Sequence, residues 1–189
     1  MPRLMIVVAS SRPGRVGLPV AEWFREIATK DDSFEIDFAD LAEINLPFLD
    51  EPDHPRLRQY QHDHTKAWSR RVEAADAFAF VTPEYNYGMP ATLLNAMDYL
   101  VHEWQYKPVG FVSYGGVSGG TRSVQMAKQV ATTLKMFALP EAVNIPFVSQ
   151  YLKDGRLDAN DVTVKAAQSV LKELLRVARA LAPLRDRVA

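Results

Sequence analysis

Short apolar runs alternate along this chain with segments of helical periodicity, and this alternation limits the folds that the chain can adopt. Five runs rich in Val, Ile and Phe predict strands; they span residues 3–10, 34–41, 77–83, 108–114 and 142–148. Five segments with apolar residues at helical spacing predict helices, at residues 16–30, 58–74, 91–104, 121–138 and 159–182. Strands that alternate with helices predict an α/β fold with a doubly wound parallel sheet.

Two of the predicted strands have the features of sheet edges. The run 34–41 alternates Phe34, Ile36 and Phe38 with acidic residues, which is typical of a strand that is covered on one face only. The run 142–148 contains Pro146, which cannot donate a hydrogen bond to a neighbouring strand. We therefore expect these two strands to be less central than the other three.

Composition narrows the kind of protein. The 189 residues are enough for one domain, expected at residues 1–189, and 48% of them are hydrophobic. A net charge of −1 argues against a nucleic-acid partner. The chain has no cysteine, which excludes disulfides, thiolate metal sites and cysteine nucleophiles, and fits a reducing compartment. The first apolar run is too short for a signal or membrane segment, so we expect a soluble, cytoplasmic protein without a membrane partner.

Three loops of unusual composition follow the first, third and fourth predicted strands. They read ASSRPGRVG at 9–17, TPEYNYGMP at 82–90 and YGGVSGG at 114–120. In an open parallel sheet, ligands bind beyond the carboxyl ends of the strands, where the strand order reverses. These three loops would flank that point in the flavodoxin-like order 2-1-3-4-5.

The first loop has the composition of an anion site. It opens a helix, whose free N–H groups attract negative charge, and it adds the hydroxyl of Ser10 and the cations Arg12 and Arg15. Gly14 and Gly17 would let the backbone approach a phosphate. The loop lacks the Lys-Ser/Thr pair of a Walker motif and the three glycines of a dinucleotide fingerprint. An ordinary Ser-capped helix with solvent-facing arginines is the alternative.

The second loop is stiffened by Pro83 and Pro90, and Gly88 is expected to allow a tight turn between them. Its polar and aromatic residues could border a planar ligand. The third loop supplies four glycines, which permit close approach of the backbone to a flat ligand edge. It also matches the G-x-S-x-G nucleophile motif at Ser118, although no histidine follows this serine and the last one is His102.

The histidines do not predict a metal site. His62 and His64 lie near several acidic residues, but a spacing of two would point their side chains apart on a helix. We interpret them, together with His54, as surface residues of an acidic segment.

Together the three loops resemble those of the NADPH-dependent FMN reductase family, flavodoxin-like enzymes that include quinone, azo-dye and chromate reductases. The resemblance extends from Met5 to about Phe147, and its most specific part is residues 82–100, which are similar to the P-E-Y-N loop of the family and the helix after it. ASSRPGRVG is similar to the G-S-x-R phosphate loop, with Ala9 where the family has Gly. YGGVSGG resembles the third, Gly-rich flavin loop.

The resemblance implies a set of FMN-binding residues. The FMN phosphate would be held by Ser10, Arg12, Arg15, Val16 and Gly17. The isoalloxazine ring would be bordered, largely through backbone groups, by Pro83, Glu84, Tyr85, Asn86 and Tyr87, and on its other side by Gly115, Gly116 and Ser118. Because the flavin carries the chemistry, no catalytic residue is expected. The resemblance further implies NADPH or NADH as electron donor and a flavin, quinone, azo compound or similar small molecule as acceptor.

Two other functions and one assembly remain open at this point. The chain could be a serine hydrolase that uses Ser118, or a flavodoxin-like electron carrier that does not turn over NAD(P)H. The segment 91–104 has more apolar residues than one sheet-facing stripe needs; they are Leu93, Leu94, Met97, Tyr99, Leu100, Val101 and Trp104. A deeply buried helix would explain them. The seam of a homodimer, which could pair into a tetramer, is the alternative that the resemblance implies.

Overall fold

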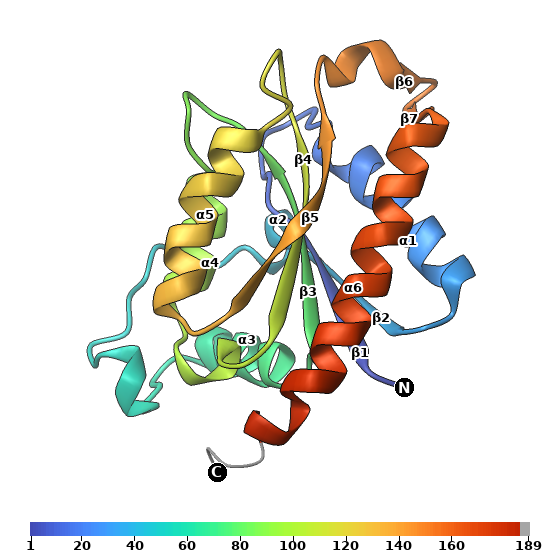
Figure 1. Ribbon diagram of the computed structural model, residues 1–189. Helices are drawn as coiled ribbons and strands as arrows, with labels where there is room; N and C mark the ends of the chain where they lie inside the picture. The colour runs from blue at the N-terminus through green and yellow to red at the C-terminus, as the bar shows by residue number, and fades with distance from the viewer. Residues whose placement is uncertain (186–189) are drawn as a thin grey trace.

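The computed structural model describes residues 1–185 and shows a parallel sheet of five strands in the order β2-β1-β3-β4-β5 (Figure 1). The strands are β1 (Arg3–Val8), β2 (Glu35–Asp40), β3 (Ala77–Pro83), β4 (Pro108–Tyr114) and β5 (Phe137–Ile145). The fold class and the strand order predicted from the sequence are confirmed. The expected domain of residues 1–189 ends with four residues, 186–189, that lie outside the described part of the chain.

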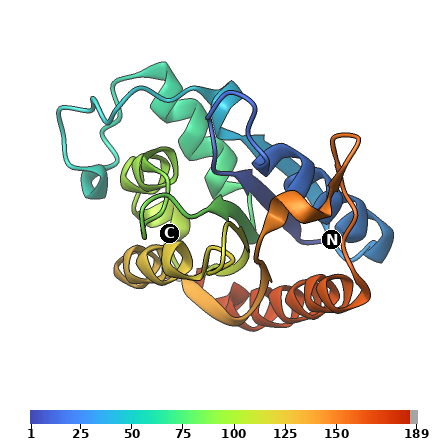
Figure 2. The same ribbon diagram turned by 90° about the horizontal axis from the view of Figure 1, so that it is seen from above.

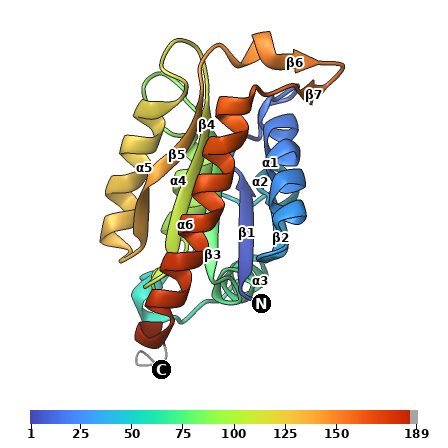
Figure 3. The ribbon, with the colours of Figure 1, turned by 45° about the vertical axis from the view of Figure 1, so that its right-hand side comes forward.

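Helices cover both faces of the sheet, so that the molecule has three layers (Figures 2 and 3). One face carries α1 (Gly17–Asp31) and α6 (Asp161–Arg185), and the other carries α3 (Asp63–Glu73), α4 (Ala91–Asp98) and α5 (Thr121–Thr133). Every residue of β3 and β4 is buried. Their side chains alternate between two apolar cores, one on each face of the sheet.

The two edge strands are those that the sequence indicated. β2 is only half buried over most of its length, and β5 exposes 49% of Phe137. The proline inside β5 is Pro140, because this strand begins at Phe137 and ends before Pro146. The predicted boundaries 142–148 were therefore wrong by several residues, although the edge position was right.

The shift in β5 follows from an early end of α5. The helix stops at Thr133 rather than at the predicted residue 138, and Lys135 takes a left-handed conformation (φ 56°) that turns the chain. Leu134 and Met136 are each 6% exposed. Their burial continues the apolar pattern beyond the helix, which explains why periodicity alone extended the helix too far.

The helix expected at 91–104 also ends early. α4 stops at Asp98, and His102–Trp104 form a separate 3₁₀ turn in which the Trp104 indole N–H donates to the carbonyl of Met97 (3.1 Å). Five of the seven apolar residues of this segment are at most 1% exposed within the single chain, namely Leu93, Met97, Tyr99, Leu100 and Trp104. The excess of apolar residues therefore fills the core, and it no longer argues for a dimer seam.

Three further features complete the chain. The helix expected at 58–74 is shorter at its N-terminus, because Arg58 is left-handed (φ 52°) and α3 begins at Asp63. The sequence reasoning missed the short helix α2 (Leu41–Ile44) and the hairpin of β6 (Leu152–Lys153) and β7 (Arg156–Leu157). The hairpin turns at Asp154-Gly155, a recognised turn pair. Over residues 1–185, none of the helices is both long and apolar enough to cross a bilayer.

Candidate functional site

The three unusual loops lie together at the carboxyl ends of the strands, at the top of the molecule in Figure 1. They connect β1 to α1, β3 to α4 and β4 to α5. The chain moves from β1 outward to β2 and then returns to β3 on the other side of β1, so the strand order reverses here. This is the position at which open α/β sheets bind ligands.

The first two loops meet through a hydrogen bond between two hydroxyl groups. Ser10 is 1% exposed, and its Oγ lies 2.6 Å from the hydroxyl oxygen of Tyr85. Thr92, in the first turn of α4, donates to the carbonyl of Ala9 and ties the start of the first loop to the helix after the second loop. Two predicted site residues from distant parts of the sequence are therefore in direct contact.

The helix that follows the first loop begins without a side-chain cap. The N-cap residue of α1 is Val16, and the first turn contains no acidic residue. The free N–H groups and the positive dipole end of α1 are therefore available to an anion. Arg12 is exposed at the rim of this loop and adds a positive charge near the helix terminus.

Arg15 has a partner that the sequence did not reveal. Its guanidinium forms an ion pair with Asp40, the last residue of β2, whose side chain is 2% exposed. Asp40 also accepts a hydrogen bond from the backbone N–H of Ala42 (3.0 Å). Arg15 thus neutralises a buried carboxylate beside the first loop, whereas Arg12 is exposed.

The second loop is a tight hairpin turn. The backbone groups of Tyr85 and Gly88 exchange two hydrogen bonds of 3.0 and 2.9 Å. The left-handed residues of the turn are Asn86 (φ 48°) and Tyr87 (φ 73°), whereas Gly88 was the residue expected to allow it. Such a conformation is costly for a bulky residue. The guanidinium of Arg122 lies 3.6 Å from the centre of the Tyr87 ring, a contact that helps to hold the turn.

Glu84 joins the second loop to the third. Its carboxylate accepts hydrogen bonds from the Ser118 hydroxyl (2.8 Å) and the Arg122 backbone N–H (3.1 Å), and forms an ion pair with the Arg122 guanidinium (2.5 Å). Burial alone would raise the pKa of Glu84, but the bonds from Arg122 and Ser118 outweigh it and hold the pKa below its usual value. The side chain of Glu84 is therefore an internal anion that fixes the distance between two loops.

The glycines of the third loop have different roles. A Cβ atom on Gly120 would lie 2.8 Å from the backbone N of Tyr114, so this glycine is required by the fold of the loop. Gly116 has open space where its Cβ atom would be, and Gly115 is half buried. The carbonyls of both are anchored by N–H groups of Phe147 and Val148. Gly115 and Gly116 are thus the part of the loop that a ligand could approach.

The geometry around Ser118 does not suit a hydrolase. Its hydroxyl donates to a carboxylate, and each of the four histidines of the chain bonds elsewhere: His54 to Arg56, His62 and His64 to Asp50, and His102 to the Arg56 carbonyl. A serine nucleophile needs a base within hydrogen-bond reach. Ser118 has no such imidazole among residues 1–185.

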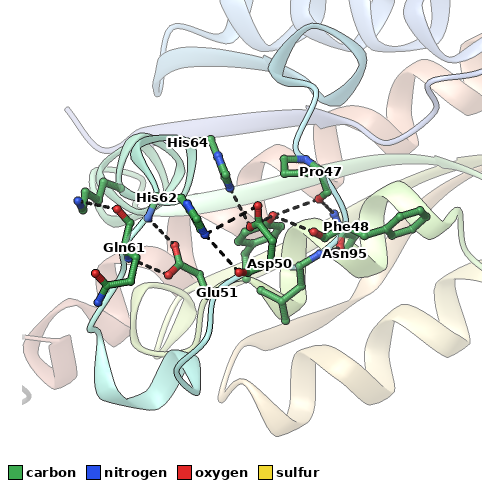
Figure 4. A network of polar contacts seen from close by, with 11 residues as sticks. Pro47, Phe48, Asp50, Glu51, Gln61, His62, His64 and Asn95 are labelled. Carbon is green, nitrogen blue, oxygen red and sulfur yellow. Dashed lines mark hydrogen bonds and ion pairs between the residues drawn. The ribbon is translucent and has the colours of Figure 1, made fainter.

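His62 and His64 lie close together, contrary to the expectation that they would point apart. His62 precedes α3 as its N-cap residue, so the spacing rule for a helix does not apply to this pair. Their rings stack with centroids 5.1 Å apart, and both face Asp50 (Figure 4). Within residues 1–185 no group of three or more His, Asp or Glu side chains has a geometry suited to a metal ion.

Four residues of this region were not identified from the sequence: Asp40, Thr92, Tyr114 and Arg122. Tyr114 is 4% exposed; it is the last residue of β4 and the first residue of the third loop. The position of Arg122 in the sequence gave one indication of its role. A cation in the first turn of a helix opposes the helix dipole, which indicates a nearby carboxylate partner such as Glu84.

Known proteins with similar sequences and folds support the resemblance of the loops. The family model described as NADPH-dependent FMN reductase matches residues 2–150. An NAD(P)H-dependent FMN reductase of Schizosaccharomyces pombe is 41% identical over 159 residues, which cover 83% of this chain and 79% of that protein. A 2-hydroxy-1,4-benzoquinone reductase of Burkholderia is 31% identical over 84% of this chain and 83% of its own length.

A solved structure shares the fold. The flavoenzyme NAD(P)H:(acceptor) oxidoreductase FerB from Paracoccus denitrificans superimposes with a TM-score of 0.74 at 21% identity, covering 95% of this chain and 98% of the other. The family match spans most of the strands and all three loops described above. This chain belongs to the NADPH-dependent FMN reductase family.

Proposed function

We propose that this protein is an FMN-dependent NAD(P)H oxidoreductase, which passes electrons from NAD(P)H through bound FMN to a flavin, quinone, azo compound or similar small acceptor. The observation that carries the proposal is the convergence of one anion-binding loop and two rigid loops at the switch point of the sheet. FMN has matching parts, since a dianionic phosphate lies at one end and a flat, polar-edged ring at the other.

The first loop fits the phosphate. The uncapped N-terminus of α1, the Ser10 hydroxyl and the exposed Arg12 supply donors and positive charge, and Arg15 removes the repulsion that Asp40 would otherwise exert on an anion. We propose that Val16 and Gly17 contribute backbone N–H groups. Arg15 would assist the binding of the phosphate mainly by neutralising Asp40.

The second and third loops fit the ring. Residues 85–88 form a tight turn closed by two backbone hydrogen bonds, and Gly116 leaves space for close approach from the other side. Glu84 and Ser118 hold these two loops together from within, so their side chains would set the width of the ring site. When bound, FMN supplies the redox chemistry by taking up a hydride and returning electrons to an acceptor. The protein would hold the ring, exclude water and admit donor and acceptor in turn.

Relatives favour a quinone-type acceptor. Besides the Burkholderia enzyme, a potato protein named NAD(P)H:quinone oxidoreductase is 29% identical over 78% of this chain. A flavodoxin-like carrier would have the same site without turnover of pyridine nucleotide, and the NAD(P)H-dependent relatives argue against it.

We also propose a homodimer, which could pair into a tetramer, and a cytoplasmic location without nucleic-acid or membrane partners. The lack of cysteine fits the location. The dimer is supported by apolar side chains that the single chain leaves exposed, namely Tyr87 (71%) and Val117 (76%) in the site loops and Phe48 (82%) between α2 and α3. Sedimentation that shows only monomers at micromolar concentration would refute the dimer.

The central experiment asks whether the protein binds FMN and whether NADPH reduces it. The purified protein, reconstituted with FMN if needed, should be yellow, and denaturation should release FMN. Without oxygen, NADPH or NADH should bleach the flavin absorbance, and a quinone should restore it. A protein that stays colourless after reconstitution would refute the proposal, whereas a bound flavin that NAD(P)H does not reduce would favour the electron carrier.

A further inference from the structure

One buried hydroxyl of the site has no partner in the part of the chain that the structure describes, although its ring belongs to the core. Tyr114 ends β4, its side chain is almost completely buried, and its hydroxyl has no hydrogen-bond partner among residues 1–185. Buried hydroxyls in native proteins are nearly always paired with protein, water or ligand. An unpaired hydroxyl in a candidate binding site is therefore a donor for a molecule that binds there.

The hydroxyl of Tyr114 lies directly under the first loop. A Cβ atom built on Gly17 would be 2.5 Å from this hydroxyl oxygen and 3.4 Å from the Cβ of Ser10. Three parts of the site thus converge on one point: the start of α1, the buried serine and the phenol of β4. Gly17 is a glycine because the phenol occupies the space of a side chain, and not only to let a phosphate approach.

The surroundings of this point favour an anion. Ser10 already shares a hydrogen bond with Tyr85, so two further hydroxyls lie at the same place. Burial raises the pKa of Tyr114, and Tyr85 raises it further, while the nearby Ser10 hydroxyl and the charges of Arg15 and Arg12 only partly oppose them. Ser10 is itself bonded to Tyr85 and leaves the phenol without a hydrogen-bond partner of good geometry among residues 1–185. The phenol therefore keeps its proton at neutral pH and can donate it to an acceptor. Asp40, the buried carboxylate beside the first loop, is neutralised by Arg15.

We propose that the Tyr114 hydroxyl donates a hydrogen bond to the phosphate group of the bound flavin from beneath the first loop. The inference rests on the proposed function, because it assigns a further residue to the same phosphate site. The 2′-phosphate of NADPH has the same chemistry, and the experiment distinguishes the two sources.

The test compares Tyr114→Phe with Tyr106→Phe, a control near the opposite end of β4. Apo protein is titrated with FMN and with riboflavin, which lacks the phosphate, and binding is followed by flavin fluorescence. Tyr114→Phe should raise the Kd for FMN about 10-fold, as for the loss of one bond to a charged group, and leave the Kd for riboflavin unchanged. Because an unpaired hydroxyl is removed, the Tm of the apo protein should not fall, but the rise in Tm on adding FMN should be smaller.

Each other outcome has a distinct meaning. Equal weakening of FMN and riboflavin would make Tyr114 a packing residue and overturn the inference. Unchanged FMN binding, with a KM for NADPH that rises while that for NADH does not, would assign the hydroxyl to the nucleotide and also overturn it. Failure of the unmodified protein to bind either flavin would instead refute the proposed function.

A second pair of variants tests the geometry without ligand. Gly17→Ala places a methyl group 2.5 Å from the Tyr114 hydroxyl, whereas in the Tyr114→Phe background the nearest ring atom, Cζ, is 3.4 Å away. The fall in Tm caused by Gly17→Ala should therefore be clearly smaller in the Tyr114→Phe background than in the unmodified protein. An equal fall in both backgrounds would show that the hydroxyl lies elsewhere and would overturn the inference.

Discussion

Two polar clusters of this molecule have similar residues, but they differ in whether their buried tyrosine hydroxyls have hydrogen-bond partners. The connector, residues 45–62 between α2 and α3, bonds to side chains of α3, of α4 and of the residue after α4. The Tyr99 hydroxyl donates to Asp50 (2.9 Å), His64 contacts the same carboxylate (3.0 Å), and Asn95 bonds to the carbonyl of Pro47 and the N–H of Leu49 (Figure 4). At the loops that end β1, β3 and β4, the N-terminus of α1 has no side-chain cap and the Tyr114 hydroxyl is unpaired among residues 1–185.

The difference shows which observation identifies a binding site. Both clusters contain tyrosines, carboxylates and basic groups, so composition alone does not distinguish them. The connector uses its donors to hold a long segment against α4, and this use is structural. Glu84 joins the second loop to the third, and Ser10 joins the first loop to the second, but donors stay unused where β1 meets α1. A ligand can accept hydrogen bonds from these donors.

The largest effect on FMN affinity is expected when Arg12, an exposed cation of the first loop, is removed. Arg12→Ala should raise the Kd for FMN about 10- to 100-fold, because a charge-assisted bond to a phosphate is lost. Riboflavin binding should change little, and the effect should shrink at high ionic strength. Arg56→Ala removes another exposed arginine, this time from the connector, and should leave both affinities unchanged. Equal losses for the two variants in a flavin titration would contradict the distinction between the clusters.

The next largest effect concerns the link between two site loops. Glu84→Gln should lower the free energy of unfolding by about 2 kcal/mol at pH 7, since bonds to a buried carboxylate are weakened. Because the pKa of Glu84 is lowered in the folded state, its contribution is present above the ordinary carboxyl pKa and is lost as pH falls through the folded value. The difference in the free energy of unfolding between the variant and the unmodified protein should therefore shrink below about pH 4.5.

Urea unfolding at pH 7 and at pH 3.5 measures this difference. Glu22→Gln is the matched control, since Glu22 forms an exposed ion pair with Arg25 on α1 and should contribute much less. If the two variants were equally stable at pH 7, or if the effect of Glu84→Gln grew in acid, the assigned role of Glu84 would be wrong.

A smaller effect compares two buried tyrosines directly. Tyr99→Phe removes a hydroxyl that is bonded to Asp50 and to the Pro47 carbonyl, and should destabilise the apo protein by about 1 kcal/mol without changing FMN affinity. Tyr114→Phe removes an unpaired hydroxyl and should have the opposite pattern, with unchanged apo stability and weaker FMN binding. Thermal unfolding with and without FMN measures both quantities. The same pattern in both variants would remove the contrast between the clusters.

The sequence was sufficient to predict the sheet, its order and the three loops because those features depend on local patterns. Apolar runs define β1, β3 and β4, and Gly and Pro mark the ends of these strands. Strand and helix boundaries were less accurate where tertiary burial continued an apolar pattern past a helix, as at Leu134 and Met136 beyond α5.

The side-chain partners within the site could not be predicted, because they depend on contacts between distant residues. Arg15 meets Asp40 only because β1 and β2 are adjacent, and Ser10 meets Tyr85 only because β1 and β3 are. The sequence indicated Gly88 as the residue that allows the turn, because a left-handed tyrosine is unusual. The structure instead places Asn86 and Tyr87 in the left-handed conformation, with the Arg122 guanidinium stacked on the Tyr87 ring. The residues proposed to hold FMN therefore came from loop composition and resemblance, while the structure supplies their partners.

The smallest effect is expected for Ser118→Ala, which also separates the reductase from the hydrolase. The Ser118 hydroxyl is one of several donors to Glu84, and the carboxylate keeps its ion pair with Arg122 when the hydroxyl is lost. Stability should therefore fall by about 0.5 to 1 kcal/mol, and the kcat for NADPH with a quinone should stay within about threefold of the unmodified protein. A hydrolase that used this serine would lose its activity almost completely. Assays of quinone reduction and of ester hydrolysis on the same two preparations decide between them, and an esterase activity that disappears in Ser118→Ala would show that the pairing with Glu84 had been misinterpreted.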